Sequence, residues 1–377
     1  MKKVLFIIDS FQTGGAEKSI LEIAQKLQKL QPIVCVLHSD KDDLREEYQR
    51  AAIAIVDLNV PRDSQFWFIK GRNKFQAICQ EFQPNIIHAH LFKSEWIART
   101  IKLPKNTVLI GSFVNDSYSK ERYKSQSFIR NLKLEIIALI DRFTIRKNQY
   151  ITSITHSIAV SNTHKLHYPL QQVQVIHRGR TVAEFSQNTL DYISEFPFKF
   201  ITVGRLLERK GYLELIKALR ILKSQLQFPF QLTIVGNGAD EIRIKQFVIE
   251  NKLDASVIFL GNRSDVPQLL QEAHCFVLPS HYEGQGGALV EAMLSGLPIV
   301  CSDIDVFKEQ VEDGVTAKLF EVKSAEALAH QMKWVMENYS KAKLLGLEAR
   351  KTGQEKFDIE RIAQQTESFY FDVIASQ

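Results

Sequence analysis

Residues 275–301 read CFVLPSHYEGQGGALVEAMLSGLPIVC and contain the pattern that decides the fold. A short apolar run, Cys275–Leu278, leads into a glycine-containing loop, a helical segment and a second apolar run, Pro298–Cys301. Near-continuous apolar strands of this kind are typical of parallel strands that are buried on both faces. The stretch therefore predicts one strand–loop–helix–strand unit of a doubly wound α/β sheet.

The same alternation of short apolar and longer amphipathic runs extends outward over the whole chain in two series. We expect strands in the first series at Val4–Ile8, Ile33–Leu37, Ile53–Leu58, Asn85–His88, Val108–Ser112 and Ile158–Ser161. The second series comprises Lys199–Val203, Gln231–Val235, Val257–Leu260, Cys275–Leu278, Pro298–Cys301 and Ala317–Phe320. Helices are expected between them, for example at Ala16–Leu30, Gly211–Leu226 and Asp240–Asn251.

Two series in 377 residues predict two Rossmann-like domains. The polar stretch 177–198 lacks periodicity, so we place the boundary there, with domains at 1–180 and 181–358. Ligands of doubly wound sheets bind outside the carboxyl ends of the strands. Two such domains that face one another are therefore expected to form a substrate cleft between them.

The overall composition excludes several classes of protein. Hydrophobic residues make up 45% and charged residues 24% of the chain, as in a folded globular protein rather than a disordered or collagen-like one. The four cysteines form no CxxC pair, so we expect reduced thiols in the core. Apolar runs fall short of the ~18 residues of a membrane span, and the run after Met1 is too short for a signal peptide. We therefore expect a cytoplasmic protein.

The net charge of +5 hides an asymmetry between the two halves. Residues 1–180 carry 27 Lys and Arg against 16 Asp and Glu, whereas residues 181–377 carry 21 against 27. Much of the excess lies in residues 117–150, where aromatics are interleaved and apolar residues recur at helical spacing. This basic amphipathic pattern predicts peripheral binding to an anionic membrane surface, and the alternative is the solvated face of a core helix. No nucleic-acid-binding motif is present, so we expect no nucleic-acid partner.

The loop inside residues 279–301 has the features of a phosphate and hydroxyl site. Three glycines, Gly284, Gly286 and Gly287, let a ligand approach the backbone at the start of a helix, where N–H groups and the helix dipole favour an anion. Glu283 on the loop and Glu291 on the helix offer acceptors for hydroxyl groups, as on a ribose or a sugar. The alternative is an ordinary helix start with a surface glutamate.

Two further loops, like the one in residues 279–301, each follow a predicted strand and precede a predicted helix. Residues 204–211, GRLLERKG, follow the first strand of the second series, so Arg205 and Lys210 are placed to neutralise a departing diphosphate. In the first series, Thr13-Gly14-Gly15 is a glycine loop at a helix start, again a candidate anion site. Ordinary solvation of the 204–211 loop is the alternative for the first of them.

Taken together, these motifs resemble the retaining GT-B glycosyltransferases of family 4, which use nucleotide sugars. The resemblance rests on Glu283-x7-Glu291 and on the order of GGAEK, NIIHAH, GRLLERKG, LTIVGNG, EGQGGALVEAMLSGLPIV and EDGVTAKLF along nearly the whole chain. It implies a GT-B fold, with the sugar nucleotide held mainly by the second domain. It also implies that a last helix, at about 359–377, packs back on the first domain.

The resemblance also implies roles for individual residues. Arg205 and Lys210 would bind the diphosphate, Glu291 the ribose and Glu283 the transferred sugar. The backbone of Gly284, Gly286 and Gly287 would contact phosphate or sugar, and Asn262–Arg263 would border the base. Arg178 and Arg180, which replace an Asn-Gly-x-Asp turn common in the family, are candidates for further phosphate contacts.

Two histidines and one acidic motif are open to different interpretations. His88 and His90 at a strand end are expected to contact the acceptor, with core packing as the alternative. Asp303-Ile304-Asp305 has the form of a metal-binding DxD, but the resemblance implies a reaction that requires no divalent metal and no cofactor.

We therefore expect a hexosyltransferase that moves a sugar from a UDP- or GDP-sugar to a glycan or lipid-linked saccharide, in surface polysaccharide, lipopolysaccharide or glycolipid synthesis. The alternatives are a GT-B nucleotide-sugar epimerase, a phosphorylase-type enzyme, and a non-catalytic relative that acts as a partner protein.

Overall fold

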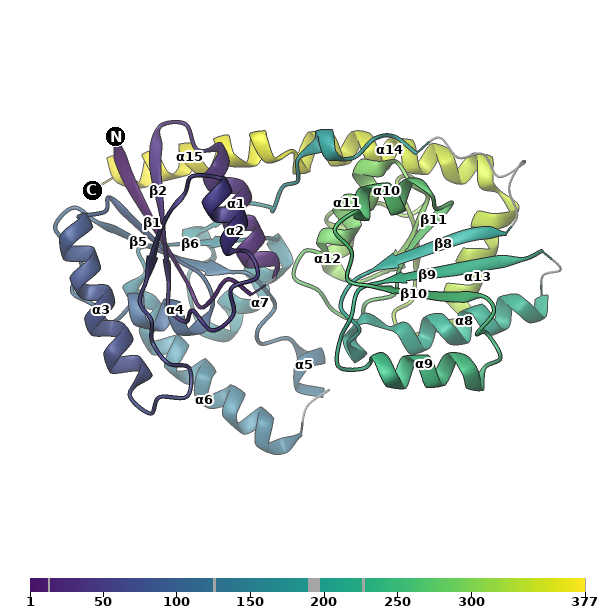
Figure 1. Cartoon of the computed structure of the whole chain (residues 1–377), viewed down its shortest axis with the longest axis horizontal. Coiled ribbons are helices and arrows are strands. Elements are labelled where there is room, and N and C mark those ends of the chain that lie inside the picture. The colour runs from purple at the N-terminus through teal and green to yellow at the C-terminus, as the bar shows by residue number, and fades with distance from the viewer. Residues whose placement is uncertain (13, 125–126, 189–196, 226–227, 377) are drawn as a thin grey trace. The chain divides into compact units, whose positions relative to one another are not determined.

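The computed structural model describes residues 1–377 except 13, 125–126, 189–196, 226–227 and 377. The chain divides into two compact units, shown with their elements in Figure 1. Unit 1 comprises Met1–Gly179 and Ile359–Gln377, and unit 2 comprises Arg180–Asp358. The chain passes between the units at Gly179/Arg180 and again at Asp358/Ile359. These two crossings lie side by side, because the backbone N–H of Arg180 donates to the carbonyl of Phe357 at 2.8 Å.

Unit 1 is a seven-stranded parallel sheet in the order β3-β2-β1-β4-β5-β6-β7. Its strands are β1 (Lys2–Ile8), β2 (Leu30–Val36), β3 (Ala54–Asp57), β4 (Ile86–Ala89), β5 (Val108–Phe113), β6 (Tyr150–Ser153) and β7 (Val173–Val175). Its α-helices are α1 (Gly15–Lys26), α2 (Arg45–Arg50), α3 (Trp67–Phe82), α4 (Phe92–Ala98), α5 (Lys120–Lys124), α6 (Phe128–Thr144), α7 (His156–Leu166) and α15 (Ile359–Ala375). Short 3₁₀ turns lie at Ile145–Lys147 and Leu170–Gln172.

The central strand of unit 1 explains why its sequence is apolar without alternation. Val4, Phe6 and Ile8 join one hydrophobic cluster, which includes side chains of α1 and α15. Leu5 and Ile7 join a second cluster on the opposite face, with side chains of α3 and α4. Because helices cover both faces, every residue from Val4 to Ile8 is buried, as a doubly wound sheet requires.

Unit 2 repeats this architecture with a six-stranded parallel sheet in the order β10-β9-β8-β11-β12-β13. Its strands are β8 (Phe198–Val203), β9 (Phe230–Val235), β10 (Val257–Gly261), β11 (Cys275–Leu278), β12 (Ile299–Ser302) and β13 (Lys318–Phe320). Its α-helices are α8 (Tyr212–Gln225), α9 (Glu241–Glu250), α10 (Val266–Gln271), α11 (Gly287–Ser295), α12 (Asp305–Lys308), α13 (Ala325–Glu337) and α14 (Tyr339–Phe357). Short 3₁₀ turns lie at Val182–Glu184 and Glu208–Lys210.

The strand order reverses once in each unit, between β1 and β4 in unit 1 and between β8 and β11 in unit 2. At such a switch point the loops that follow the two strands diverge to opposite faces, which leaves a crevice outside their carboxyl ends. The strand order therefore predicts one ligand site in each unit, at the carboxyl ends of β1 and β4 in unit 1 and of β8 and β11 in unit 2.

The predicted α/β class with two Rossmann-like sheets is confirmed, but one predicted strand is wrong. Ile158–Ser161 lies inside α7, whose start is capped by Thr155, since its side chain accepts from the N–H of Ile158 at 3.3 Å. Buried residues on α7 recur at helical spacing, at 158, 159, 162, 163 and 166. The strand in this region is β6, which sequence analysis missed because its Thr and Ser residues break the apolar pattern.

Smaller differences concern boundaries. The first helix ends at Lys26, and Leu30, its predicted last residue, opens β2. Thr13, Leu226 and the 189–196 part of the predicted linker lie outside the described residues. All four cysteines are buried and free. Within the described ranges, no helix is both long and apolar enough to span a membrane.

Candidate functional site

The switch point of unit 2 brings together the two motifs that sequence analysis singled out. Strand β8 pairs with β11, so residues 204–211 and 279–287 leave neighbouring strands at the same edge. The two loops touch at Gly211, where a Cβ would lie 2.0 Å from the carbonyl oxygen of Pro279. Gly211 also has a φ of +70°, so only glycine fits this contact without strain.

Glu283 is the centre of a charged cluster between these loops. Its side chain is 6% exposed, and its carboxylate accepts from Lys210 Nζ, from Arg209 Nη1 at 3.1 Å and from Ser280 Oγ at 2.8 Å. Burial alone would raise the pKa of Glu283, but the charges of Lys210 and Arg209 and these hydrogen bonds outweigh it and lower its pKa to about 2. Glu283 is therefore an ionised hydrogen-bond acceptor at neutral pH.

Arg205 differs from its two neighbouring cations. It is exposed, and no hydrogen bond or ion pair holds its guanidinium within the part of the chain that the structure describes. It follows β8 by two residues, so it stands at the same sheet edge as Lys210. The site thus combines two cations held on a buried carboxylate with one cation available to an incoming anion.

The start of α11 forms the second half of this site. Gly286 precedes the helix with a φ of +79°, and a Cβ there would lie 2.7 Å from the ring of Phe307. No side chain caps the helix start, so the N–H groups that follow Gly286 have no side-chain acceptor among the described residues. Gly284 belongs to the same loop and Gly287 is the first residue of α11.

Glu291 projects from the first turns of α11 and is paired with Arg180. Arg180 Nε donates to Glu291 Oε1 at 2.9 Å, and both side chains are largely buried. A Cβ on Gly287 would lie 2.5 Å from Arg180 Nη2, so the guanidinium lies directly over the helix start. Arg180 therefore adds a positive charge where the helix dipole already favours an anion.

The remaining predicted residues of unit 2 lie further along the same edge. Asn262 and Arg263 follow β10, which is two strands away from β8 in the sheet. Arg263 is exposed and pairs with Asp265, with Nη2 and Oδ2 2.6 Å apart. Of the DxD residues, Asp303 accepts from the N–H of Val322 at 3.1 Å, whereas Asp305 is exposed. No group of three or more His, Cys, Asp or Glu side chains that could hold a metal occurs among the described residues.

In unit 1, the glycine pair lies between β1 and α1 as predicted, flanked by charged side chains. A Cβ on Gly14 would lie 2.3 Å from Glu17 Oε2, and one on Gly15 would lie 2.6 Å from Arg178 Nη1. The close approach of both side chains accounts for the absence of a Cβ at either position. Glu17 next to Gly14 makes this helix start less favourable for an anion than that of α11.

His88 is a residue of the core. Its Nδ1 lies 2.6 Å from the hydroxyl of Tyr370, and its Nε2 lies 3.0 Å from Thr152 Oγ1 and 2.8 Å from Ser112 Oγ. Burial lowers the pKa of His88 to about 3. The hydrogen bonds of the two ring nitrogens thus connect β4 with β5, β6 and α15. This position corresponds to core packing, the alternative to a contact with the acceptor. His90 is partly buried, and its Nε2 has no hydrogen-bond partner in the described part of the chain.

Sequence analysis missed two members of the unit 2 site. Arg209 was quoted within GRLLERKG but not singled out, although a second cation beside Lys210 was the available signal. Ser280, which donates to Glu283, gave no signal because a serine after a strand is common. The Arg180–Glu291 pair joins residues 111 positions apart, so no local pattern contained it.

Comparison with known proteins agrees with the division into two Rossmann-like units. A family model described as "Glycosyltransferase Family 4" matches residues 13–184, and one described as "Glycosyl transferases group 1" matches residues 192–352. HepE from Anabaena, solved in complex with UDP and glucose, has a TM-score of 0.83 with 20% identity, and the match covers 100% of both chains. This likeness shows a common fold. The chain belongs to the GT-B glycosyltransferases and is family 4-like.

Two curated relatives are more similar in sequence. The chain is 27% identical over 239 residues to N-acetyl-alpha-D-glucosaminyl L-malate synthase of Bacillus anthracis, a match that spans 62% of either chain. It is 26% identical over 308 residues to the capsular polysaccharide biosynthesis glycosyltransferase CapH of Staphylococcus aureus, covering 81% of this chain and 82% of that protein.

Proposed function

We propose that the protein is a retaining glycosyltransferase that moves a hexose from a UDP- or GDP-sugar to a saccharide acceptor in surface polysaccharide or glycolipid synthesis. The observation that carries this proposal is the cluster of Lys210, Arg209 and Glu283 beside the start of α11, at the switch point of unit 2. The similarity to the capsular polysaccharide biosynthesis glycosyltransferase CapH and to HepE, which was solved with UDP and glucose, supports a polysaccharide product and a nucleotide-sugar donor.

Each group of the site has a task in this reaction. Arg205, Lys210 and the N–H groups at the start of α11 bind the diphosphate and stabilise the negative charge that it gains as its bond to the sugar breaks. Glu283, kept ionised by its cations, accepts hydrogen bonds from hydroxyls of the transferred sugar. Glu291 accepts from the ribose, and Arg180 both orients Glu291 and adds charge beside the phosphates.

The ion pairs of the two carboxylates argue against a protein nucleophile. Glu283 is held by two cations and Glu291 by one, so neither is free to attack the anomeric carbon. The acceptor hydroxyl then attacks from the face that the diphosphate leaves, and a phosphate oxygen takes its proton. The negative charge of the leaving group is balanced by Arg and Lys side chains, the role that a metal ion fills in other enzymes.

The experiment that tests the proposal is a transfer assay with a panel of UDP- and GDP-sugars, followed by NMR of the anomeric proton in the product. We expect a product with the configuration of the donor. A sugar nucleotide that is epimerised in the absence of acceptor would instead support the epimerase alternative. Failure of every nucleoside diphosphate to raise the melting temperature would support a non-catalytic partner protein.

Glu291→Ala is expected to weaken nucleoside diphosphate binding by about 10- to 100-fold, because hydrogen bonds to a charged group contribute roughly 1.5–3 kcal/mol. Titration calorimetry with UDP and GDP measures this loss. Glu291→Gln, which keeps one amide oxygen as acceptor, should retain part of the affinity. Unchanged affinity in the alanine variant would contradict the assignment of Glu291 to the ribose.

The proposed acceptor side includes an anionic membrane surface that contacts α6. Six large apolar side chains are exposed on this helix: Phe128 (82%), Ile129 (67%), Leu132 (54%), Ile136 (53%), Leu139 (53%) and Phe143 (74%). Five of them, from Ile129 to Phe143, recur every three or four residues, which makes a continuous stripe that we call the apolar face of α6. An exposed apolar stripe of this length is unusual on a protein that contacts only water.

The charges around this stripe favour an anionic surface. Arg130, Lys133, Arg142, Arg146 and Lys147 are all exposed. The two acids of the helix are already paired, Glu135 with Lys165 at 2.7 Å and Asp141 with Arg99 at 2.7 Å. A basic rim around an apolar stripe suits a bilayer with anionic head groups, and the solvated-face alternative does not explain the stripe.

Replacing Ile136 and Leu139 together by Ser is expected to weaken binding to phosphatidylglycerol vesicles by about tenfold or more, since each apolar side chain inserted in lipid contributes roughly 1.5–3 kcal/mol. Flotation measures the bound fraction, and high salt should lower it further. The matched control replaces Ile242 and Ile249, exposed by 84% and 59% on α9, and should bind as the wild type does. Equal binding to vesicles of phosphatidylcholine alone would contradict the role of the basic rim.

A further inference from the structure

A pocket of about 330 Å³ lies at the switch point of unit 1, where the order of its strands reverses. Asp9 follows β1, Glu95 lies on the helix that follows β4, and Ser112 is near the end of β5, so the pocket is at the carboxyl edge of three adjacent strands. It is the counterpart in unit 1 of the position that the charged cluster occupies in unit 2. Its volume is within the range of small-molecule sites.

The polar side chains of this pocket include atoms without protein partners. Asn162 is 1% exposed, and its Nδ2 donates to the carbonyl of Asn115 at 3.1 Å, but its Oδ1 has no partner among the described residues. The Nε of Arg99 is likewise buried without a partner in the described ranges. Leaving such atoms unpaired costs roughly 1–3 kcal/mol each, which indicates that a polar ligand or water completes them.

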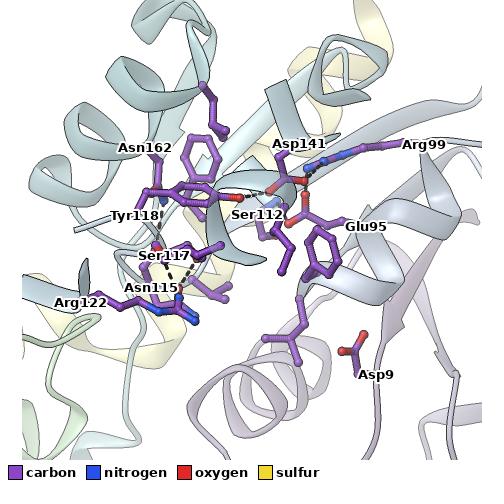
Figure 2. Close-up of a pocket in the computed structure, with 17 residues that line it drawn as sticks. Asp9, Glu95, Arg99, Ser112, Asn115, Ser117, Tyr118, Arg122, Asp141 and Asn162 are labelled. Carbon is purple, nitrogen blue, oxygen red and sulfur yellow. Dashed lines mark hydrogen bonds and ion pairs between the residues drawn. The ribbon is translucent and has the colours of Figure 1, made fainter. Parts of the chain in front are cut away.

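Asp9 adds an acceptor at the other side of the pocket (Figure 2). Its Oδ1 accepts from the N–H of Ser94 at 2.9 Å and from Ser94 Oγ at 2.6 Å, which fixes the carboxyl group. Its Oδ2 accepts no hydrogen bond from the residues that the structure describes. The pocket therefore offers acceptors at Asn162 and Asp9 and a donor at Arg99, a mixture that hydroxyl groups satisfy because each both donates and accepts.

The charges of the lining disfavour an anion. Arg99 is committed to Glu95 and to Asp141, as the hydrogen bonds in Figure 2 show. Burial raises the pKa of Glu95 to about 7 and also raises the pKa of Asp9, so both carboxyl groups are destabilised as anions. A phosphate or carboxylate in this pocket would lie near three acidic side chains, those of Asp9, Glu95 and Asp141. Of the two arginines in the lining, Arg99 is already paired with two of these acids. An uncharged ligand avoids this repulsion.

Apolar side chains also line the pocket and suit the C–H faces of a sugar ring. They are Leu91, Phe92, Phe113, Val114, Leu134, Ile137 and Leu166. Leu134 and Ile137 come from α6, the helix whose opposite face carries the exposed apolar stripe. One helix thus forms a wall of the pocket and the proposed membrane contact, which suits an acceptor that is presented from a lipid surface.

We infer that this pocket binds the sugar ring that receives the transferred hexose, and that the acceptor terminus is an uncharged, hydroxyl-rich saccharide rather than a sugar phosphate or a small carboxylate. Asp9 Oδ2 and Asn162 Oδ1 are its main acceptors. This inference rests on the proposed function, since a glycosyltransferase needs an acceptor site apart from its donor site.

The test uses the full chain and saturation-transfer NMR with methyl glycosides of glucose, galactose, mannose and N-acetylglucosamine, with glucose 1-phosphate as the anionic comparison. We expect at least one glycoside to bind, and Asp9→Asn to weaken it by about 5-fold or more, because the variant keeps the Oδ1 contacts with Ser94 and loses only the free acceptor. UDP binding should stay unchanged. The matched control, Asp63→Asn, changes an exposed carboxylate and should behave as the wild type.

Three outcomes would overturn the inference while the donor site stands. These are no glycoside binding by a protein that binds UDP, unaltered glycoside affinity in Asp9→Asn, and tighter binding of glucose 1-phosphate than of any glycoside. Failure to bind UDP or GDP would instead refute the proposed function itself.

Discussion

Lys210→Ala is expected to slow sugar transfer by about 10²- to 10³-fold while the protein stays folded, the loss typical of removing one preorganised group that stabilises transition-state charge. Lys210 Nζ contacts Glu283 in a site from which water is largely excluded, with the lysine side chain 11% and the glutamate side chain 6% exposed. A positive charge in such surroundings interacts strongly with the diphosphate, whose charge grows as the sugar departs. We therefore expect kcat to fall more than KM rises in steady-state assays.

Arg209→Ala is the control for the loss of a cation from the same carboxylate. Arg209 Nη1 contacts Glu283 at 3.1 Å and the carbonyl of Tyr282 at 3.0 Å, so it holds the loop as well as the charge. We expect Arg209→Ala to lower kcat by about tenfold, which is less than the loss expected in Lys210→Ala. Lys210→Arg should keep part of the activity that Lys210→Ala loses. Equal losses in both alanine variants together with lower melting temperatures would indicate a structural role. Near wild-type kcat in Lys210→Ala would contradict the proposed mechanism.

The candidate site of unit 2 was largely predictable because its residues are close together in the sequence. The segments 204–211 and 279–291 each carry several candidate residues, and both follow strongly apolar strands. Parallel strands place the loops that follow them at one edge of the sheet, so recognising β8 and β11 is enough to bring Lys210 near Glu283. What the strands do not determine is which cation pairs with which carboxylate.

The pocket of unit 1 was not predictable for the opposite reason. Its polar residues come from five separate segments, around positions 9, 95, 115, 141 and 162, and none of them stands in a recognisable motif. Asn162 lies on α7, part of which was predicted to be a strand. Contacts such as Asn162 with Asn115 arise only when α7 packs against the sheet.

The Arg99 network shows how such a pocket is stabilised, and it gives the second large expected effect. Arg99→Ala is expected to lower the free energy of unfolding of unit 1 by about 3–5 kcal/mol. Arg99 is 5% exposed; its Nη1 donates to Asp141 Oδ1 at 2.7 Å and its Nη2 to Glu95. Without the guanidinium, two carboxylates remain close together and poorly solvated, with no cation to balance them.

The pH dependence of this loss distinguishes it from a simple packing defect. Desolvation already raises the pKa of Glu95 to about 7, so folding favours its protonated form and stability falls as pH rises toward that value. Removing Arg99 takes away the nearest positive charge and raises the pKa further. The destabilisation is therefore expected to be larger at about pH 8 than at about pH 6.

Urea unfolding followed by tryptophan fluorescence measures the effect in unit 1 when Trp334, the tryptophan of unit 2, is replaced by Phe, because Trp67 and Trp96 then report on unit 1 alone. The control is Arg50→Ala, which breaks an ion pair with Glu46 whose side chains are 73% and 81% exposed. It should cost no more than about 0.5 kcal/mol, since water solvates both charges when the pair is lost. A loss in Arg99→Ala as small as that of the control would mean that the buried carboxylates are protonated or solvated without Arg99, and the charge balance argued for the pocket would then be wrong.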